Sequence, residues 1–449
     1  MKLSVEELSH LLLALMLLLS AAHACGYLFA RLRQPRVIGE ILGGLLLGPT
    51  LFGAIGPEAH AFAFPKAGAV PAVIDAIYQL GLLLLMFGAG AELRSTFGPG
   101  EGKTVGWVTV TGMVVPFAVG LGFVALIPSA ELIGPANSRA AFVLVFSLAI
   151  AVTSIPVISR IMGDLGILDT PFARIVLAVA VIEDVIVYVI LAIAIGLVTT
   201  PASHAFGLQH ALGLAPGSAA SVAYHVAVTL AFLGLARGLG PSAYRHVRRF
   251  RFNLVRRGSV IGFQLAFMLA VTVLATLLGV VPLFGAFLAG IAIGAAGKDG
   301  AAEARETIRA FSLAFFVPVY FAIVGLRLDL LHEFSLHFFA LFLAIACVAK
   351  AASVWAGARL AGESPNAAWN LAVALNARGG PGIVLASVAY DSAIISQQFY
   401  AVLVLLAIVT SLLAGTWLER VVRSGAPLRG PALSPETPSA QAPGSRVYP

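Results

Sequence analysis

Long apolar stretches follow one another along almost the whole chain, and no other feature of the sequence limits the fold as strongly. Thirteen of them are long enough to be candidates for crossing a bilayer, since a helix needs ~20 apolar residues to span the hydrocarbon region. Charged residues make up only 11% of the 449 residues, too few to cover a soluble domain of that size. The approximate limits of the stretches are 8–30, 36–54, 71–93, 104–127, 139–162, 171–198, 219–237, 259–280, 282–297, 308–328, 336–359, 366–390 and 396–419. We therefore expect an all-α polytopic membrane protein with about 13 transmembrane helices within residues 1–423.

The lysine and arginine residues predict the orientation of the chain. If the stretches alternate in direction, 22 of the 28 basic residues fall on one side of the membrane, and an excess of basic residues is typical of the cytoplasmic side. We expect the N-terminus outside, the C-terminus in the cytoplasm, and an inner (plasma) membrane location. The basic run from Arg245 to Arg257 is then a short connection beside anionic lipid rather than a nucleic-acid site. Residues 424–449, rich in proline, serine and glycine, are expected to form a disordered cytoplasmic tail.

Three charged residues lie deep within apolar stretches. Glu183 and Asp184 are near the middle of the stretch 171–198, where a carboxylate costs at least ~2.5–3.5 kcal/mol and usually marks an ion or proton pathway. The alternative is a structural polar pair at a helix contact. Lys350 lies ~20 Å from the outer end of its own stretch and needs a buried partner. We expect it to contact Glu183 or Asp184; shielding by backbone carbonyls alone is the alternative.

Two interrupted segments occupy matching positions in two similar halves of the chain. Residues 37–53 resemble residues 282–294, and each begins a five-helix unit. The first unit begins at a cytoplasmic connection and the second at an external one, so the sequence predicts two inverted five-helix repeats. Such repeats with interrupted helices point to the binding site of a secondary transporter.

The residues at the two interruptions explain why the helices should break there. Pro156 lacks a backbone donor in the first segment, and Gly379 and Gly380 disfavour helix in the second. Freed carbonyls and half-helix ends would face a buried cavity rather than lipid. Thr153 and Ser154 add the oxygen ligands that a monovalent cation prefers. Simple kinks without a binding role are the alternative.

Together these motifs resemble, in order and spacing, the second branch of the monovalent cation:proton antiporters, within the sodium/hydrogen exchanger superfamily. Residues 34–49 are similar to the second-helix signature, residues 152–160 to the first broken helix, and residues 376–379 to the second. The resemblance implies the sodium/proton antiporter fold, with crossed broken helices, and a homodimer whose core moves elevator-fashion. The parts implied are a dimerisation part at about 1–93 and 259–328, a core at about 104–198 and 336–423, and a linker helix at about 219–237.

The resemblance also implies roles for individual residues. Asp184 matches the essential aspartate that binds a cation or a proton in alternation, and Lys350 matches the lysine that pairs with the preceding acidic residue in electrogenic members. Thr153 and Ser154 match the ligands of the first broken helix. Glu183 departs from the family pattern, in which electrogenic members have Asp, electroneutral members Asn, and glutathione-gated potassium efflux members Gln. The residues expected to support the broken helices are Pro156, Asn376, Arg378, Gly379 and Gly380; of these, the Arg378 guanidinium should bind unwound backbone carbonyls.

The sequence therefore predicts an antiporter that exchanges a monovalent cation, sodium in preference to potassium, for protons by alternating access around Asp184. A sodium-coupled organic anion symporter of related inverted-repeat fold and a cation channel are the alternatives. Whether exchange is electrogenic or electroneutral stays open. No enzyme, cofactor or resident metal is expected, because the stretches contain no nucleophile–base arrangement, and Cys25 and Cys347 lie in separate stretches. The expected partners are the transported ions, membrane lipid and a second copy of the chain.

Overall fold

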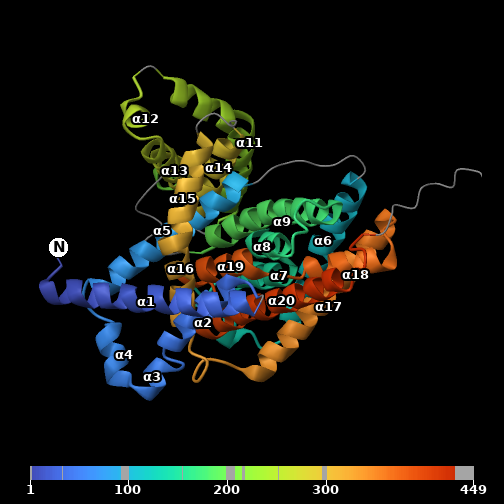
Figure 1. Ribbon diagram of the computed structural model, residues 1–449, viewed down its shortest axis with the longest axis horizontal. Helices are drawn as coiled ribbons and strands as arrows, with labels where there is room; N and C mark the ends of the chain where they lie inside the picture. Colours follow the sequence, from blue (N-terminus) through green and yellow to red (C-terminus); the bar gives the residue numbers. More distant parts are fainter. Residues whose placement is uncertain are drawn as a thin grey trace, which may run out of the picture.

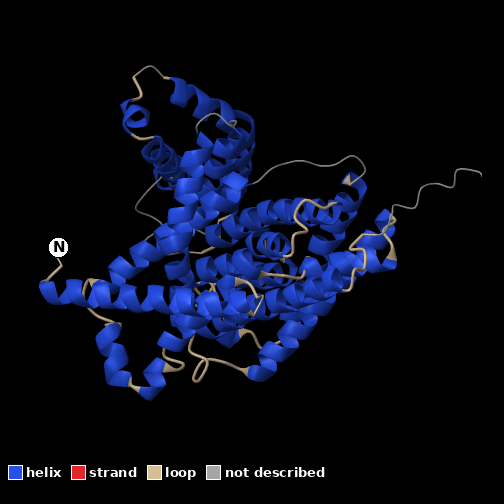
Figure 2. Cartoon of the chain, viewed as in Figure 1, coloured by secondary structure: helices blue, strands red, loops and turns tan. Residues whose placement is uncertain are grey.

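A computed structural model describes residues 3–32, 34–92, 101–153, 155–198, 208–214, 218–250, 252–295 and 301–429. Within these ranges the regular structure is helical, apart from one isolated bridge between Ile133 and Ile395 (Figure 2). The predicted all-α membrane fold is thereby confirmed. Ten of the described helices are long and apolar enough to cross a membrane, or up to eleven if the bent helix α11 counts as one span.

The predicted number of 13 transmembrane helices is not confirmed. The stretch 139–162 forms a helix of only 13 residues, α7, which is followed after a break by the 10 residues of α8. The stretch 282–297 forms α14, which has 14 residues. Both α7 and α14 are apolar but shorter than a span requires.

The helices pack into two groups that are joined by a connecting segment (Figure 1). The scaffold group consists of α1 (Val5–Arg31), α2 (Arg36–Leu47), α5 (Val70–Glu92), α13 (Val260–Leu277), α14 (Pro282–Ala295), α15 (Ala301–Phe311), the π-helical turn η3 (Ser312–Phe316) and α16 (Val317–Leu326). The crossing group consists of α6 (Gly102–Leu126), α7 (Arg139–Ala151), α8 (Ile155–Asp164), α9 (Pro171–Gly196), α17 (Leu336–Ala361), α18 (Pro365–Ala374), α19 (Gly379–Asp391) and α20 (Gln397–Arg423). The shorter elements are α3 (Phe52–Ile55), α4 (Pro57–Ala63), η1 (Ala130–Leu132) and α10 (Leu208–Ala211).

The connecting segment contains α11 (Ala219–Arg249) and α12 (Leu254–Gly258). Helix α11 packs against α9 of the crossing group and against α14 of the scaffold group. Its far end and α12 project from the rest of the molecule at the top of Figure 1. This segment is therefore in contact with both groups.

Glycines bring the backbones of the scaffold helices into direct contact. A side chain on Gly44 of α2 would meet the backbone of Ala322 in α16, and one on Gly325 of α16 would meet the backbone of Ile41. Gly90 of α5 and Gly290 of α14 form a second such crossing, each against the other helix's backbone. Small residues of this kind let membrane helices approach closely. Close packing stabilises helix association in lipid, where there is no hydrophobic driving force between the helices.

Local sequence signals set the helix boundaries around the interrupted segments. Thr170 caps α9 by accepting from the N–H of Ala173, and Pro171 follows at the first helical position. Helix α17 ends at Gly362, whose φ of 98° is the left-handed conformation that glycine adopts readily. These two caps fix where α9 begins and where α17 ends.

Side chains rather than glycine crossings join the two groups. The Tyr188 hydroxyl of α9 donates to Met86 Sδ of α5 at 3.2 Å, and the Tyr400 hydroxyl of α20 donates to the carbonyl of Val324 in α16, also at 3.2 Å. Both tyrosines are buried. The interface between the groups thus contains specific polar contacts within an apolar surrounding.

One arginine also links the groups at a helix end. Arg327, directly after α16, donates to Asp75 of α5 at 2.9 Å and to Asp391 at the end of α19 at 3.0 Å. Its guanidinium lies 4.2 Å from the centre of the Tyr78 ring. Two carboxylates from different groups therefore share one guanidinium.

The beginning of the expected tail lies against the crossing group. Arg429 donates to the Glu363 carboxylate at 2.8 Å, and Asn370 donates to the carbonyl of Leu428 at 3.1 Å. The described part of the tail, up to Arg429, is thus held by polar contacts, and the remainder, 430–449, lies outside the described residues.

Candidate ion-binding site

The two interrupted segments meet inside the crossing group. Helix α7 ends at Ala151 and α8 begins at Ile155, while α18 ends at Ala374 and α19 begins at Gly379. The Thr153 hydroxyl donates to the carbonyl of Leu375 at 2.6 Å, and both residues are buried. A carbonyl freed by the second break is thus satisfied by a side chain from the first, as a buried backbone group requires.

Ser154 and Pro156 are the two expected site residues whose side chains the structure does not describe. Ser154 lies outside the described residues, and Pro156 is placed by its backbone in the first turn of α8. The structure therefore places Thr153, but not Ser154, at the meeting point of the breaks.

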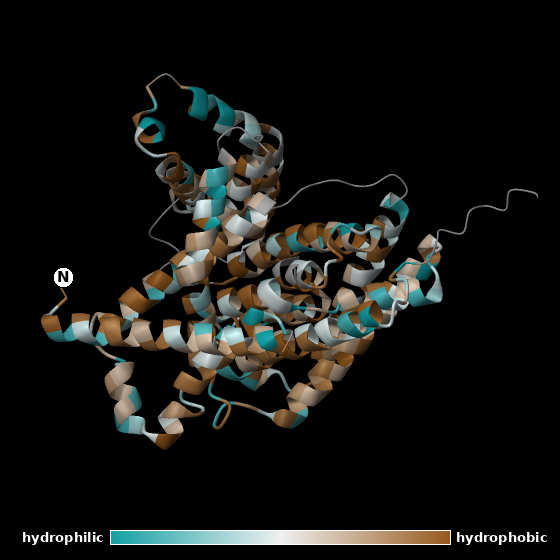
Figure 3. Cartoon of the chain, viewed as in Figure 1, coloured by the Kyte–Doolittle hydropathy of each residue, from teal (hydrophilic) through white to brown (hydrophobic). Residues whose placement is uncertain are grey.

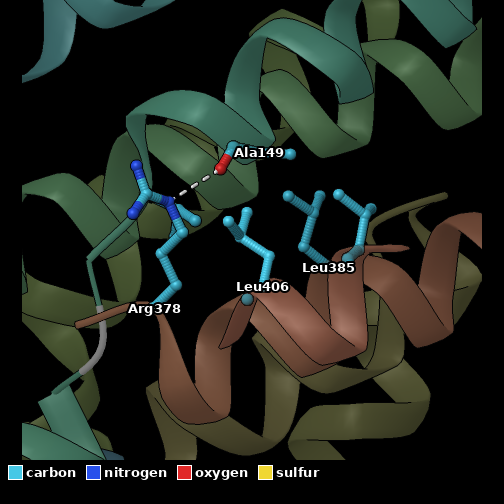
Figure 4. A pocket seen from close by; sticks show the side chains of 7 residues that line it. Ala149, Arg378, Leu385 and Leu406 are labelled. Atoms are coloured by element: carbon cyan, nitrogen blue, oxygen red, sulfur yellow. Dashed lines mark hydrogen bonds between the residues drawn. The ribbon is translucent and has the colours of Figure 1, made fainter. Parts of the chain in front are cut away.

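Arg378 holds the backbone around both breaks. Its guanidinium is almost fully buried and donates to the carbonyl of Ala149 at 3.1 Å (Figure 4). It also donates to the carbonyls of Ile150 at 2.7 Å and Ala346 at 2.8 Å. It also donates to the side chain of Asn376 at 2.5 Å. Its rigid array of donors suits this task. The predicted binding of backbone carbonyls by Arg378 is present.

Side chains of α20 cap the beginning of α19. The backbone N–H of Arg378 donates to the Thr410 hydroxyl, and that of Gly379 donates to the Ser411 hydroxyl, each at 3.2 Å. Gly380, the next residue of α19, is also buried. Sequence analysis missed Thr410 and Ser411, although two adjacent hydroxyl residues inside an apolar stretch were a usable signal.

A small cavity beside Arg378 is not suited to binding a cation. Figure 4 shows Ala149, Leu385 and Leu406 turned toward it, with Arg378 at one end. The complete lining is Ala149, Val152, Arg378, Gly382, Leu385, Leu403 and Leu406. These side chains offer no oxygen ligand, so we assign the cavity to packing around the break.

Lys350 and Glu183 form a fully buried ion pair. Lys350 Nζ lies 2.8 Å from Glu183 Oε1 and 2.9 Å from Oε2, and both side chains have no exposed surface. The same ammonium donates to the carbonyls of Gly112 in α6 at 2.9 Å and Ala151 in α7 at 2.6 Å. The predicted contact with an acidic residue is present, and the carbonyls share the ammonium. Breaking such a pair from one side is strongly destabilising, because it leaves a buried charge uncompensated.

Asp184 has a different environment from its neighbour. Its side chain is 3% exposed, and Oδ1 has no hydrogen-bond partner among the residues that the structure describes. A buried ionised carboxylate without a partner is costly, so this oxygen needs either a proton or a cation. The pair Glu183–Lys350 is thus internally compensated, whereas Asp184 Oδ1 has no compensating partner among the described residues.

No cluster of three or more His, Cys, Asp or Glu side chains that could hold a metal ion occurs within the described ranges. The oxygens of this region are those of Thr153 and of backbone carbonyls at the breaks, those of Glu183, whose partner Lys350 also binds the carbonyl of Ala151, and those of Asp184, the next residue of α9. These oxygen atoms are hard ligands with little total charge. Such ligands suit a weakly bound monovalent cation rather than a transition metal.

The chain is similar to known membrane transport proteins over nearly its whole length. A family model described as "Sodium/hydrogen exchanger, transmembrane" matches residues 15–424. Na(+)/H(+) antiporter NhaS4 of Synechocystis sp. is 26% identical over 416 residues, which cover 91% of this chain and 96% of that protein. Cation/H(+) antiporter 18 of Arabidopsis thaliana is 28% identical over 408 residues, or 89% of this chain and 47% of the plant protein. K(+)/H(+) antiporter 1 of Saccharomyces cerevisiae is 27% identical over 399 residues, or 85% and 43%.

The chain spans about half the length of the plant and yeast relatives. Among solved structures, the sodium proton antiporter MjNhaP1 from Methanocaldococcus jannaschii matches with a TM-score of 0.60 at 15% identity, covering 93% of this chain and 99% of that one. At this identity the match shows the fold.

Proposed function

Because the chain belongs to the sodium/hydrogen exchanger family, we propose that it is a secondary active antiporter that exchanges a monovalent cation for protons at Asp184. The observation that carries the proposal is the buried Oδ1 of Asp184, which has no hydrogen-bond partner among the described residues, beside the compensated pair Glu183–Lys350. Binding a cation and a proton to one carboxylate at the same time is energetically unfavourable. At high proton activity Asp184 is protonated and releases the cation, and at low proton activity the carboxylate binds it.

Thr153 is the proposed second ligand. Its hydroxyl proton is committed to the carbonyl of Leu375, which leaves lone pairs free to accept a cation. The sequence assigns a third ligand to Ser154, which lies outside the described residues. The opposed ends of the half-helices add partial charges at the same depth.

We further infer that the two helix groups move relative to one another. The scaffold group corresponds to the expected dimerisation part, and the crossing group to the expected mobile core, with α11 as the linker. Backbone contact through glycines within the scaffold group, and side-chain contacts between the groups, support this division. Alternating access would then expose Asp184 first to one side of the membrane and then to the other. From the excess of basic residues we infer that the C-terminal end and the α11–α12 turn lie in the cytoplasm.

Sodium is the proposed cation, and potassium is the competing one. The Synechocystis relative is named for sodium and the yeast relative for potassium, at nearly the same identity. The decisive experiment uses purified protein in liposomes with an internal pH dye. Proton flux is recorded while sodium, lithium, potassium or rubidium is titrated at several pH values.

The expected result is a saturable, cation-dependent proton flux whose half-saturation concentration rises as the pH falls, because protons compete for Asp184. Sodium-driven uptake of an organic anion without proton flux would support the symporter instead. Cation current at a fixed pH gradient, with no coupled proton movement, would support a channel.

A further inference from the structure

We propose that Arg327 is a latch between the two helix groups, and that it must release Asp391 before the groups can move relative to one another. The guanidinium donates to Asp391 of the crossing group at 3.0 Å and to Asp75 of the scaffold group at 2.9 Å. The first of these two bonds crosses the boundary between the groups, and the second does not. The inference rests on the proposed function, because it assigns a residue to the movement that alternating access requires.

The backbone around Arg327 is fixed to the scaffold group. The Thr50 hydroxyl, just beyond the end of α2, donates to the carbonyl of Leu328 at 2.7 Å and accepts from the N–H of Leu330 at 3.1 Å. The guanidinium lies over the Tyr78 ring of α5, 4.2 Å from its centre, and such a cation–π contact is stabilising. Arg327 therefore stays with the scaffold group when the groups move.

Asp391 is fixed to the crossing group in a similar way. It is the last residue of α19, and the turn that follows it pairs with the connection between α6 and α7. The N–H of Gly134 donates to the carbonyl of Ile394 at 2.9 Å. The N–H of Ser396 donates to the carbonyl of Leu132, also at 2.9 Å. Asp391 therefore moves with α19, whose other end begins at the second helix break.

Asp75 allows the latch to open without leaving an uncompensated charge. The side chains of Arg327, Asp75 and Asp391 are 22%, 60% and 30% exposed, so water reaches all three. When Asp391 leaves, the guanidinium keeps Asp75 and the Tyr78 ring, and the Asp391 carboxylate is hydrated. Ion pairs with this exposure are weak, so the pair shifts the ratio of closed to open protein by at most ~5-fold. Such a contact can slow the movement without preventing it.

Buried hydroxyl groups line the boundary beneath the latch. Tyr78 of α5 and Tyr320 of α16 have ring centres 5.1 Å apart. Ser387 lies one turn before Asp391, on the same face of α19. The three side chains have no exposed surface, and their oxygens have no hydrogen-bond partner among the described residues. A buried hydroxyl without a partner is costly, so water that enters when the groups separate would stabilise the open state.

The opposite end of the boundary is held less firmly. There Gln34, between α1 and α2, donates to the Thr416 hydroxyl of α20 at 3.4 Å. Figure 3 shows the long helices on both sides of the boundary as largely hydrophobic, and apolar faces alone would let the groups slide. From the excess of basic residues on the other side, we infer that the Arg327 end faces outward. The latch therefore closes the outer end of the boundary.

The test measures how fast Ser387→Cys reacts with a charged, water-soluble maleimide in the purified full-length protein. Cys25→Ala and Cys347→Ala remove the two native thiols from the background. Asp391→Asn breaks the bond between the groups, so we expect ~5-fold faster labelling. Asp75→Asn is the matched control, because it removes the other bond of the same guanidinium within the scaffold group, and labelling should stay slow. Asp391→Glu keeps the carboxylate and should also stay slow.

Unchanged labelling in Asp391→Asn would overturn the latch. Equal acceleration by Asp75→Asn or by Asp391→Glu would overturn it too, because the effect would then be a general loosening of the helix ends. If Asp391→Asn does not fold, Arg327→Lys replaces it, since an ammonium lacks the planar fork that serves two carboxylates. Faster labelling in that variant supports the latch, and wild-type labelling overturns it.

Proton flux in liposomes separates this inference from the proposed function. Cation-dependent flux in the wild type, together with unchanged labelling in Asp391→Asn, would overturn the latch and leave the antiporter standing. Accelerated labelling in a protein without such flux would support the latch and overturn the proposed exchange.

Discussion

At the scale of single residues, two adjacent carboxylates have opposite surroundings. Glu183 is fully enclosed and paired with Lys350, whereas Asp184 Oδ1 has no partner in the described part of the chain. The spacing predicted that Lys350 contacts one of them, and only the family resemblance indicated that the partner is the residue before Asp184, Glu183. Neighbouring residues on a helix point ~100° apart, so the choice depends on the rotation of α9 against α17. That rotation is set by tertiary packing and cannot be predicted from the spacing of the charged residues along the sequence.

Replacing Asp184 with Asn should abolish cation-dependent proton flux, because the amide can neither ionise nor balance a bound cation. Glu183 and Lys350 keep their pairing, so folding should be retained. Flux in liposomes is the measurement, and elution volume and thermal unfolding serve as controls for folding. Substantial transport by the variant would remove Asp184 from the proposed role.

Replacing Gly112 with Ala tests how closely α6 encloses the ion pair. The added methyl group would lie 3.0 Å from Val354 Cγ2 and 3.4 Å from Glu183 Oε1. Such overpacking typically costs ~1–3 kcal/mol, and here it would displace the pair. We expect slower transport and a lower unfolding temperature. Gly106→Ala on the same helix is the matched control, since a side chain there meets nothing within 4 Å. Identical behaviour of the two variants would contradict the tight enclosure.

At the scale of helices, the two breaks stabilise one another. Pro156 and the pair Gly379–Gly380 predicted where the helices end, because these residues act on the local backbone. The capping of α19 by Thr410 and Ser411 could not be predicted in the same way. Those hydroxyls come from a helix further along the chain, and their role depends on how α20 packs.

Replacing Thr153 with Val removes the hydroxyl that joins the breaks at nearly constant volume. The carbonyl of Leu375 then loses its partner, and the proposed cation loses a ligand. A net loss of ~1 kcal/mol corresponds to a ~5-fold rise in the half-saturation concentration of the cation. Thr272→Val is the control, because that buried hydroxyl bonds only within its own helix, to Met268. If flux measurements give the same affinity for wild type and Thr153→Val, the hydroxyl is not a ligand.

At the scale of the whole molecule, the all-α membrane fold and the family could be predicted from the sequence, whereas the number of spans could not. Apolar length identified every transmembrane candidate, but α7 and α14 are too short to span alone. Each is buried along most of its length by neighbouring helices, and such packing is not registered by hydropathy. The Arg327 link between α5 and α19 was likewise not predictable, because its two carboxylates are far apart in sequence.

The whole molecule should carry net charge across the membrane in each cycle. Lys350 is paired with Glu183, and Asp184 Oδ1 has no partner among the described residues. If cation binding separates Lys350 from Glu183, the freed ammonium can give up one proton and Asp184 the other, so that two protons exchange for one cation. A membrane potential of 100 mV then contributes ~2.3 kcal/mol for the net charge moved. Sodium-driven proton flux in liposomes should therefore change when potassium and valinomycin set a membrane potential. Glu183→Gln should make exchange insensitive to that potential or inactive; rates of the wild type that ignore the potential would indicate one-for-one exchange.

The glycine crossings of the scaffold group also bear on which mutations the protein tolerates. At Gly44 and Gly325 any side chain would force the helix axes apart, since the obstacle is backbone and cannot rotate away. At the boundary between the groups, by contrast, the neighbours are side chains such as Met86 and Tyr188, which can repack around a substitution. Substitutions should thus be nearly forbidden at the glycine crossings and tolerated at the boundary along which we propose that the two groups move. Differences in transport speed between variants are therefore expected to arise at that boundary, while most losses of expression arise at the crossings.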